Sequence, residues 1–312
     1  MNEEQISRTA QMTAFSRGYH SRNDAPVIFE DRLAFELLGQ DVQRSIEQQM
    51  LATLRAVNPD AAAAFSDDES ALGWLMQTGA AAPIVLGRAK FAEELLERAV
   101  EDGVSQYVLL GAGLDTFAFR RPDLLAKLRL FELDHPGTQE YKRQRLDELG
   151  WELSDNLRLV PVDFTRSSLV EALQGAGFNQ QVPAFFSWLG VTYYLTPGEV
   201  MGTLRDIARN AAPGSSVVFD YLDTAAYDHR LASSRVRRMI EAVRQMGEPM
   251  LSGFDPVTLG EELAQGGLTL VKDLSPMDIH SRYFMGRTDH YRACEHVHFA
   301  QARLSRSSGA ND

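Results

Sequence analysis

The spacing of apolar residues divides the chain into two parts. From residue 6 to about residue 100 the apolar positions recur at helical spacing, as in the set Phe91, Leu95, Leu96 and Val100, and runs of β-branched residues are few. This pattern predicts helices and no strand in the first third of the chain.

After Gly103 the pattern changes to short apolar runs that alternate with segments long enough to hold a helix. Each run ends in a glycine or an acidic residue. This alternation is typical of βαβ units, so it predicts a parallel sheet with helices on both faces. The five runs are residues 107–110, 128–133, 157–162, 184–189 and 217–219.

The last third of the chain carries mixed signals. Thr196, Pro197 and Glu199 form a capping-box pattern, which predicts a helix that runs to about Arg209. Further on we expect a helical insertion over residues 225–250, a helix over 256–265, a strand over 268–274, and a final strand within 282–303.

Composition and charge narrow the class of protein. The chain has 31 Lys and Arg against 43 Asp and Glu, a formal net charge of −12, which argues against nucleic acid as a partner. Its 44% hydrophobic and 24% charged residues are typical of a globular chain. The longest apolar stretch, residues 182–195, is broken by Pro183 and Gly190 and is too short to span a bilayer, so we expect no membrane partner.

The cysteine and histidine pattern argues against a disulfide and against a metal. Cys294 is the single cysteine, and the acidic start of the chain lacks the order of a signal peptide, so we expect a cytoplasmic protein. Cys294, His296 and His298 alternate and would share one face of a strand. They lack the loop-separated ligand pairs of a zinc site, so we predict a polar strand face and no metal.

The ends of the predicted strands carry the candidate chemistry, because ligands of open α/β sheets bind there. The first strand ends in Gly111-Ala112-Gly113, which is either a plain strand-to-helix turn or a close approach to a ligand. Thr116 stands where a dinucleotide fingerprint has its third glycine. Asp115 is unfavourable beside a pyrophosphate and suits an amino-bearing ligand. Both disfavour an NAD-dependent dehydrogenase.

The next two strand ends describe a nucleoside. Asp134, about twenty residues beyond the glycine turn, is placed to accept hydrogen bonds from ribose hydroxyls. Asp163 and Phe164 offer an acid for an adenine amino group and an aromatic ring for its face. Since no Lys/Arg cluster or phosphate loop accompanies them, the predicted nucleoside is not phosphorylated.

Five blocks in this order resemble the leucine carboxyl methyltransferase family of S-adenosylmethionine-dependent methyltransferases, with its bacterial O-methyltransferase branch the closer match. The resemblance covers about residues 5–305. It implies a Rossmann-like class I methyltransferase sheet with helices on both faces, a helical lid over residues 1–85, and a cofactor-binding domain over 86–312 with an insertion at about 225–265. The blocks are Gly87-Arg88, residues 110–116, residues 131–134, Asp163-Phe164 and residues 194–197.

The resemblance also implies roles for single residues and S-adenosylmethionine as the cofactor. Arg88 would bind its methionine carboxylate, and Asp134 the ribose. Residues 7–10 and 17–19 resemble the family's lid. Leu189 stands where members often carry Glu, which puts a protein-methylating activity in doubt. The residues expected to bind the cofactor are Arg88, Gly111, Ala112, Gly113, Asp115, Asp134, Asp163 and Phe164.

The methyl acceptor is less well indicated. A carboxylate acceptor needs no general base, whereas a phenol, with a pKa of about 10, needs one. Tyr194 belongs to a shared block and is the candidate catalytic residue at the acceptor site. His20, beside Arg17 and Arg22, is expected at the lid surface. Other candidates are Tyr19, Tyr193, Tyr221, Asp223, Arg282 and Tyr283.

The sequence therefore predicts methyl transfer from S-adenosylmethionine to a carboxylate or hydroxyl oxygen of a small molecule, with natural products among the candidates. Two alternatives stay open: a non-catalytic S-adenosylmethionine sensor, and a protein carboxyl methyltransferase. Neither the acceptor nor the oligomeric state can be read from the sequence.

Overall fold

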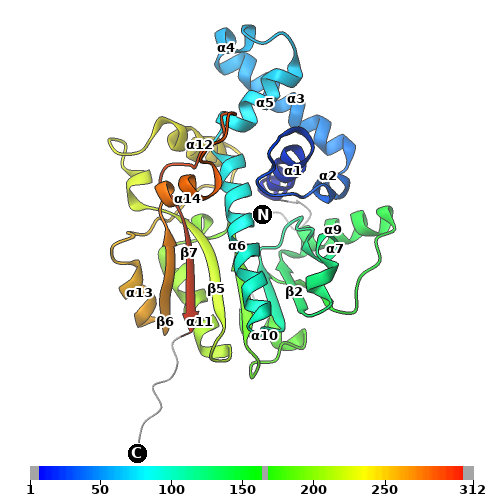
Figure 1. Ribbon diagram of the computed structural model, residues 1–312, viewed down its shortest axis with the longest axis vertical. Helices are drawn as coiled ribbons and strands as arrows, with labels where there is room; N and C mark the ends of the chain where they lie inside the picture. The colour runs from blue at the N-terminus through cyan, green and yellow to red at the C-terminus, as the bar shows by residue number, and fades with distance from the viewer. Residues whose placement is uncertain (1–6, 164–167, 305–312) are drawn as a thin grey trace, which may run out of the picture.

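The computed structural model describes residues 7–163 and 168–304, and within them the chain forms a seven-stranded sheet in the order β3-β2-β1-β4-β5-β7-β6. Helices cover both faces, and the amino-terminal helices form a group beyond one end of the sheet (Figure 1). This is the predicted α/β, Rossmann-like sheet.

The first five strands run parallel and match the five predicted runs. The last strand of the chain lies between β5 and β6 and is antiparallel to both, with Val217 opposite Ala302. The strands are β1 (Gln106–Leu110), β2 (Arg129–Asp134), β3 (Leu157–Pro161), β4 (Ala184–Trp188), β5 (Ser216–Leu222), β6 (Leu268–Leu274) and β7 (Val297–Leu304).

Several helices start at a side-chain cap, as α11 does. Thr196 accepts from the Glu199 backbone N–H, and the Glu199 side chain accepts from the Thr196 backbone, as the capping box predicts. The described helices are α1 (Arg8–Asn23), α2 (Leu33–Leu38), α3 (Gln40–Val57), α4 (Pro59–Ala63), α5 (Asp68–Thr78), α6 (Ala81–Glu101), α7 (Phe117–Arg120), α8 (Pro122–Leu125), α9 (Pro136–Leu149), α10 (Leu169–Gly175), α11 (Pro197–Asn210), α12 (Ser234–Gln245), α13 (Leu259–Gln265) and α14 (Pro276–Tyr283), with 3-10 turns η1 (Thr192–Tyr194) and η2 (Thr224–Tyr227).

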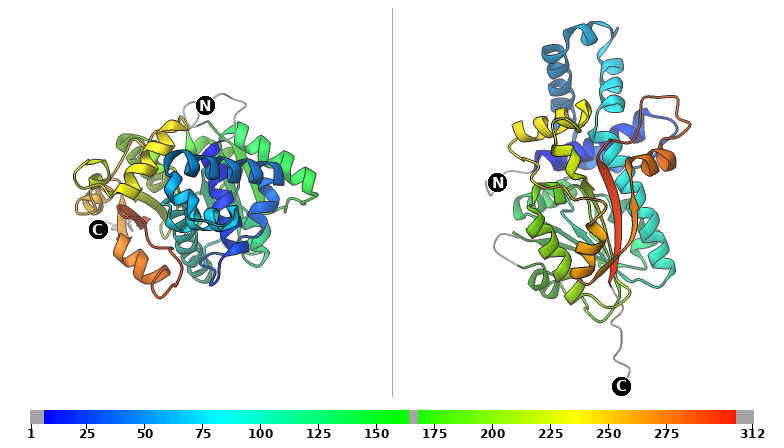
Figure 2. Two further views of the ribbon diagram at one scale, coloured as in Figure 1. Left: turned by 90° about the horizontal axis from the view of Figure 1, so that it is seen from above. Right: turned by 90° about the vertical axis from the view of Figure 1, so that its left-hand side faces the viewer.

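Two hydrophobic cores lie on opposite faces of the sheet, because successive side chains of a strand point to opposite sides. On β1, Tyr107 and Leu109 join the core that α6 and the amino-terminal helices contribute to. Val108 and Leu110 join the core made with α10, α11 and α13. The right-hand view of Figure 2 shows helices flanking the sheet on both sides. Strands buried on both faces explain the continuous apolar runs in the sequence.

Helix α6 connects the amino-terminal helices to the sheet. In Figure 1 it runs from the amino-terminal group down along the sheet, and it contacts both α1 and β4. The boundary predicted after residue 85 falls inside this helix. The division into a lid and a cofactor-binding domain stays a prediction.

The predicted helix over residues 225–250 is wrong in part. Only η2 and α12 are helical there. Ser233 caps α12 by accepting from the Val236 N–H, and the chain reaches φ +85° at Gly247, which cannot continue a helix. Helix α14 is not predicted by the sequence, and it ends at Tyr283, just inside the segment expected to hold the final strand.

Cys294, His296 and His298 do not share a strand face, because β7 begins at Val297 and His296 adopts φ +69°. Burial raises the pKa of the Cys294 thiol to about 12. The Nδ1 atom of His296 lies 2.9 Å from an oxygen of Asp223. Among the described residues no group of three or more His, Cys, Asp or Glu could hold a metal ion, and no helix is long and apolar enough to cross a membrane.

Candidate functional site

The glycine turn joins the ends of β1 and β2. The backbone N–H groups of Gly111 and Ala112 both donate to the carbonyl oxygen of Leu133, at 2.9 and 3.0 Å. Gly111 has φ +72°, and a Cβ there would lie 2.5 Å from the Val191 side chain. Only glycine meets both demands without strain. The turn therefore brings backbone close to whatever binds at this edge.

Asp134 lies beside that turn at the end of β2. Its Oδ2 accepts from the Gly113 N–H at 2.5 Å and its Oδ1 from the His135 N–H at 2.6 Å. Burial raises the pKa of Asp134, and these two backbone donors oppose the rise. A carboxylate accepts up to about four hydrogen bonds, so two acceptor positions remain for a ligand. A pair of ribose hydroxyls fits this need.

A buried ion pair between α9 and β2 contacts the segment that follows the glycine turn. The Lys142 ammonium, fully buried on α9, donates to the carbonyl oxygen of Asp115 at 2.6 Å and pairs with Glu132. Burial raises the pKa of Glu132 to about 6, and Lys142 opposes the rise. One oxygen of the Asp115 carboxylate accepts at 2.7 Å from the N–H of Phe117, the first residue of α7. The predicted contact of Asp115 with an amino group stays a prediction.

Arg88 projects from α6 toward the ends of β4 and β5. Its Nη1 lies 2.9 Å from Oδ2 of Asp220, which is fully buried. The other Asp220 oxygen accepts from the Gly190 N–H at 2.7 Å. A Cβ on Gly190 would lie 2.3 Å from the Arg88 guanidinium, so the side chain is held against this glycine. The ion pair uses one of five guanidinium N–H donors, so Arg88 can also bind a ligand carboxylate.

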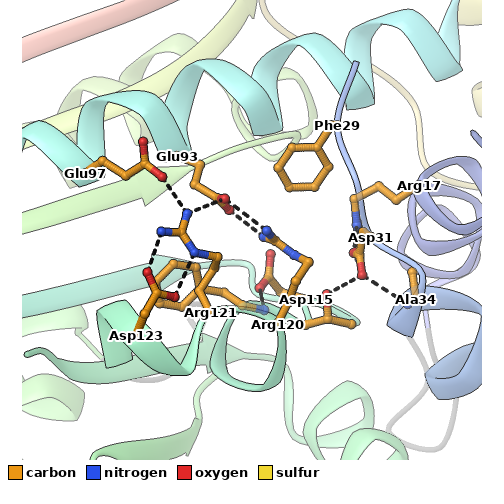
Figure 3. Close-up of polar contacts among 12 residues, drawn as sticks. Arg17, Phe29, Asp31, Ala34, Glu93, Glu97, Asp115, Arg120, Arg121 and Asp123 are labelled. Carbon is orange, nitrogen blue, oxygen red and sulfur yellow. Dashed lines mark hydrogen bonds and ion pairs between the residues drawn. The ribbon is translucent and has the colours of Figure 1, made fainter. Parts of the chain in front are cut away.

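The amino-terminal helices are bonded to the segment that directly follows the glycine turn, and Figure 3 shows Arg17 and Ala34 meeting at Asp31. Arg17 of α1 donates to the Leu114 carbonyl at 2.7 Å and pairs with Asp31 at 2.8 Å. Asp31 also accepts from the Thr116 hydroxyl at 2.6 Å and the Ala34 N–H at 3.1 Å. Asp31 is a site residue that the sequence did not indicate. The family resemblance places the Arg17 segment in the lid, but no motif in the sequence marks its partner.

A second group of ion pairs in Figure 3 fastens the helices after the glycine turn to α6. Arg120 donates to Glu93 at 3.0 Å, and Arg121 donates to Glu97 at 2.6 Å. The Arg120 guanidinium also lies 4.6 Å from the ring centre of Phe29. The segment that follows the turn is therefore bonded both to the amino-terminal helices and to α6.

Tyr194 lies in η1, directly after β4, and is half-buried. Burial raises the pKa of its hydroxyl, and a hydrogen bond with Thr9 of α1 and the charge of Arg88 oppose the rise. Its neighbour Tyr193 is buried and donates to Asp220. Tyr194 is therefore the tyrosine that stands between α1 and the Arg88 guanidinium. Its catalytic role stays a prediction.

Asp163 follows β3 at the same edge of the sheet as Asp134, because the Val162 N–H donates to the Asp134 carbonyl at 2.8 Å. Phe164 lies outside the described residues. Leu189 follows β4 and is half-buried. The contact of Asp163 with an adenine stays a prediction.

Four other acceptor candidates lie in different surroundings. The Tyr221 hydroxyl donates to Asp273 at 2.7 Å on the far face of the sheet. Asp223 caps η2 by accepting from the Ala226 N–H at 3.0 Å. Arg282 and Tyr283, on α14, both bind Glu94. Each of these four side chains is therefore bonded to a group other than Tyr194.

The prediction that His20 lies at the lid surface is wrong. Its side chain is fully buried, with Nδ1 2.9 Å from Asp24 and Nε2 accepting from the Ile28 N–H at 2.7 Å. Tyr19 is buried against Phe15, with ring centres 5.9 Å apart. Both residues connect α1 to its neighbours in the amino-terminal group.

Known proteins are similar to this chain in sequence. The sequence matches the leucine carboxyl methyltransferase family over residues 10–208. It is 37% identical over 303 residues to "Putative S-adenosyl-L-methionine-dependent methyltransferase YktD" of Bacillus subtilis (strain 168), covering 97% of this chain and 99% of that protein. It is 30% identical over 244 residues to a protein of the same description from Mycolicibacterium paratuberculosis, covering 78% and 74%.

Solved structures show the same fold at low sequence identity. A putative methyltransferase from Thermobifida fusca has a TM-score of 0.53 at 16% identity, covering 78% of this chain and 90% of that one. A DUF574 family protein from Streptomyces avermitilis has a TM-score of 0.52 at 14% identity, covering 77% and 92%. The cofactor of this chain is S-adenosylmethionine, and the chain belongs to the leucine carboxyl methyltransferase family of S-adenosylmethionine-dependent methyltransferases.

Proposed function

We propose that this methyltransferase transfers the methyl group to a carboxylate or hydroxyl oxygen of a small molecule. The observation that carries the proposal is the lid: α1 is tied to the glycine turn through Arg17 and lies beside Tyr194. A site closed in this way by its own helix suits a small acceptor better than a folded protein surface. Leu189, in place of an acid, also counts against a protein acceptor.

The chain's own residues have simple tasks in this reaction. The cofactor supplies a methyl group on a positively charged sulfur. Asp134 binds the ribose hydroxyls, Arg88 binds the methionine carboxylate, and the glycine turn lets the backbone approach. Because the charge on sulfur disappears in the displacement, alignment and exclusion of water are the main contributions of the protein. The Arg17–Asp31 contact, which holds α1 on the turn, serves both.

Partners and location follow from the same proposal. We expect a small-molecule acceptor, and neither nucleic acid nor membrane, in keeping with the net charge of −12. A cytoplasmic location stays a prediction. A protein that only senses S-adenosylmethionine would have the same cofactor contacts, so catalysis itself must be measured.

The proposal is tested by titrating the purified protein with S-adenosylmethionine, S-adenosylhomocysteine and NAD, then measuring S-adenosylhomocysteine release with aromatic acids and phenols as acceptors. We expect micromolar binding of the first two ligands, none of NAD, and a product that carries the methyl group on oxygen. Binding without turnover of any acceptor would favour the sensor. Methylation of a protein carboxyl terminus would favour the protein methyltransferase.

Replacing Arg88 tests the methionine end of the site. Arg88→Ala should weaken S-adenosylhomocysteine binding about 30-fold, since a charge-assisted contact contributes about 2 kcal/mol. Adenosine, which lacks the methionine carboxylate, should lose less than about threefold. Both affinities can be measured by calorimetry, with Lys90→Ala on the same helix as the control. Equal losses for both ligands would count against a carboxylate contact.

A further inference from the structure

A loop of the insertion meets the start of α1 beside Tyr194. The Leu251 N–H donates to the Tyr193 carbonyl at 2.5 Å, and the Ser252 hydroxyl donates to the Thr192 carbonyl at 2.9 Å. The loop that follows α12 is therefore fastened to η1, and Glu248 lies in this loop. Nothing in the predicted helical pattern marked this residue.

The Glu248 carboxylate faces α1. Its Oε1 accepts from the Ser7 hydroxyl at 3.2 Å, and its Oε2 accepts from the Thr9 hydroxyl. Burial raises the pKa of the Tyr194 hydroxyl, Thr9 opposes the rise and Glu248 adds to it, so both side chains lie near this hydroxyl. Three groups from distant parts of the chain, Tyr194, Thr9 and Glu248, therefore form one polar cluster.

Within residues 7–163 and 168–304 no basic side chain pairs with Glu248, whose carboxylate is bonded to the Ser7 and Thr9 hydroxyls. The cation near Tyr194 is Arg88, which is already paired with Asp220. The negative charge of Glu248 therefore stays beside the tyrosine. A carboxylate acceptor placed here would meet a like charge in a partly buried site, whereas a neutral hydroxyl would meet a hydrogen-bond acceptor.

Aromatic side chains border the same place. The rings of Tyr193 and Tyr194 lie edge to face, 6.0 Å between centres. The Tyr227 hydroxyl of η2 donates at 2.7 Å to the carbonyl of Ser252, the residue whose side chain is bonded to η1. Aromatic faces flanking a hydrogen-bond acceptor suit an aromatic hydroxyl compound.

We propose that the cluster of Tyr194, Thr9 and Glu248 is the acceptor site and that it takes the hydroxyl of a neutral aromatic compound, with Glu248 as the general base. This inference rests on the proposed function and narrows it from two acceptor classes to one. The acceptor oxygen forms a bond to the methyl carbon as its proton passes to Glu248. The carbon–sulfur bond breaks and its electron pair stays on sulfur, which leaves a methyl ether, S-adenosylhomocysteine and a protonated Glu248.

Three naphthalenes that differ in one substituent test the charge argument: 2-naphthol, 2-naphthoate and the cationic 2-(aminomethyl)naphthalene. Their affinities are measured by calorimetry on protein saturated with S-adenosylhomocysteine, and methyl transfer is measured separately. We expect wild type to bind 2-naphthol at least about tenfold more tightly than 2-naphthoate and to methylate its oxygen. Stronger binding of the naphthoate or of the amine, or binding of none of the three, overturns the hydroxyl assignment.

Glu248→Gln tests the base. The substitution should lower turnover of 2-naphthol about 100-fold, which is at the lower end of the range for general base catalysis. It should also reduce the difference in affinity between 2-naphthol and 2-naphthoate to less than about threefold. Glu241→Gln, an exposed residue paired with Arg244 on α12, is the control and should change neither. If Glu248→Gln turns over 2-naphthol at the wild-type rate, Glu248 is not the general base. Wild type, Glu248→Gln and Glu241→Gln should bind S-adenosylhomocysteine with the same affinity. If wild type does not bind S-adenosylhomocysteine, the proposed function itself is overturned.

Discussion

Asp134→Ala should raise the dissociation constant for S-adenosylhomocysteine at least about 100-fold. Asp134 is the acid at the end of β2, and two of its acceptor positions are taken by the N–H groups of Gly113 and His135. The remaining positions would receive two ribose hydroxyls, and each charge-assisted hydrogen bond contributes about 1.5–3 kcal/mol. Losing both therefore corresponds to at least two orders of magnitude in affinity.

The fold should survive this substitution. Removing Asp134 also removes a buried negative charge, and this offsets part of the cost of leaving two backbone N–H groups without an acceptor. Circular dichroism and thermal unfolding check the fold, and calorimetry checks the affinity. Asp147→Ala, at an exposed position on α9, is the control and should bind as wild type does. Unchanged affinity in Asp134→Ala would overturn the ribose assignment.

The sheet and its ligand-binding edge could be predicted because their signals are local. Five apolar runs that end in glycine or an acid became β1 to β5, and the acids at 134 and 163 lie at one edge. The capping box at Thr196 also depends only on residues within one turn of helix. Patterns of this kind can be read from the sequence because they involve residues that are close together along the chain.

The network that joins α1 to the segment after the glycine turn could not be predicted, because it depends on contacts between distant residues. Asp31 has no motif around it, and its importance comes from Arg17 and from Thr116, 85 residues away. Glu248 lies in a segment expected to be helical, and its neighbours Ser7 and Thr9 come from the start of the chain. His20 was expected at the surface because of its charged neighbours, yet packing around α1 buried it completely.

The contact of Arg17 on α1 with Leu114 and Asp31 leads to the second large prediction. Arg17→Met should lower the free energy of unfolding by about 3–5 kcal/mol, because it leaves the Asp31 carboxylate, 1% exposed, without its cation. Asp31→Asn should cost a similar amount by leaving the buried guanidinium unpaired. The double variant should lose much less than the sum, since neither charge then remains without a partner.

Urea unfolding measures these free energies, and an exposed ion pair supplies the comparison. Arg44 and Asp41 on α3 lie 2.6 Å apart and are both largely exposed, so Arg44→Met should cost less than about 1 kcal/mol. Because Arg17 also donates to the Leu114 carbonyl, Arg17→Met should weaken S-adenosylhomocysteine binding as well as stability, whereas Arg44→Met should leave it unchanged. If Arg17→Met and Arg44→Met change stability and affinity equally, the Arg17–Asp31 pair does not hold α1 at the glycine turn. A loss of stability without a loss of affinity would mean that the pair stabilises α1 alone.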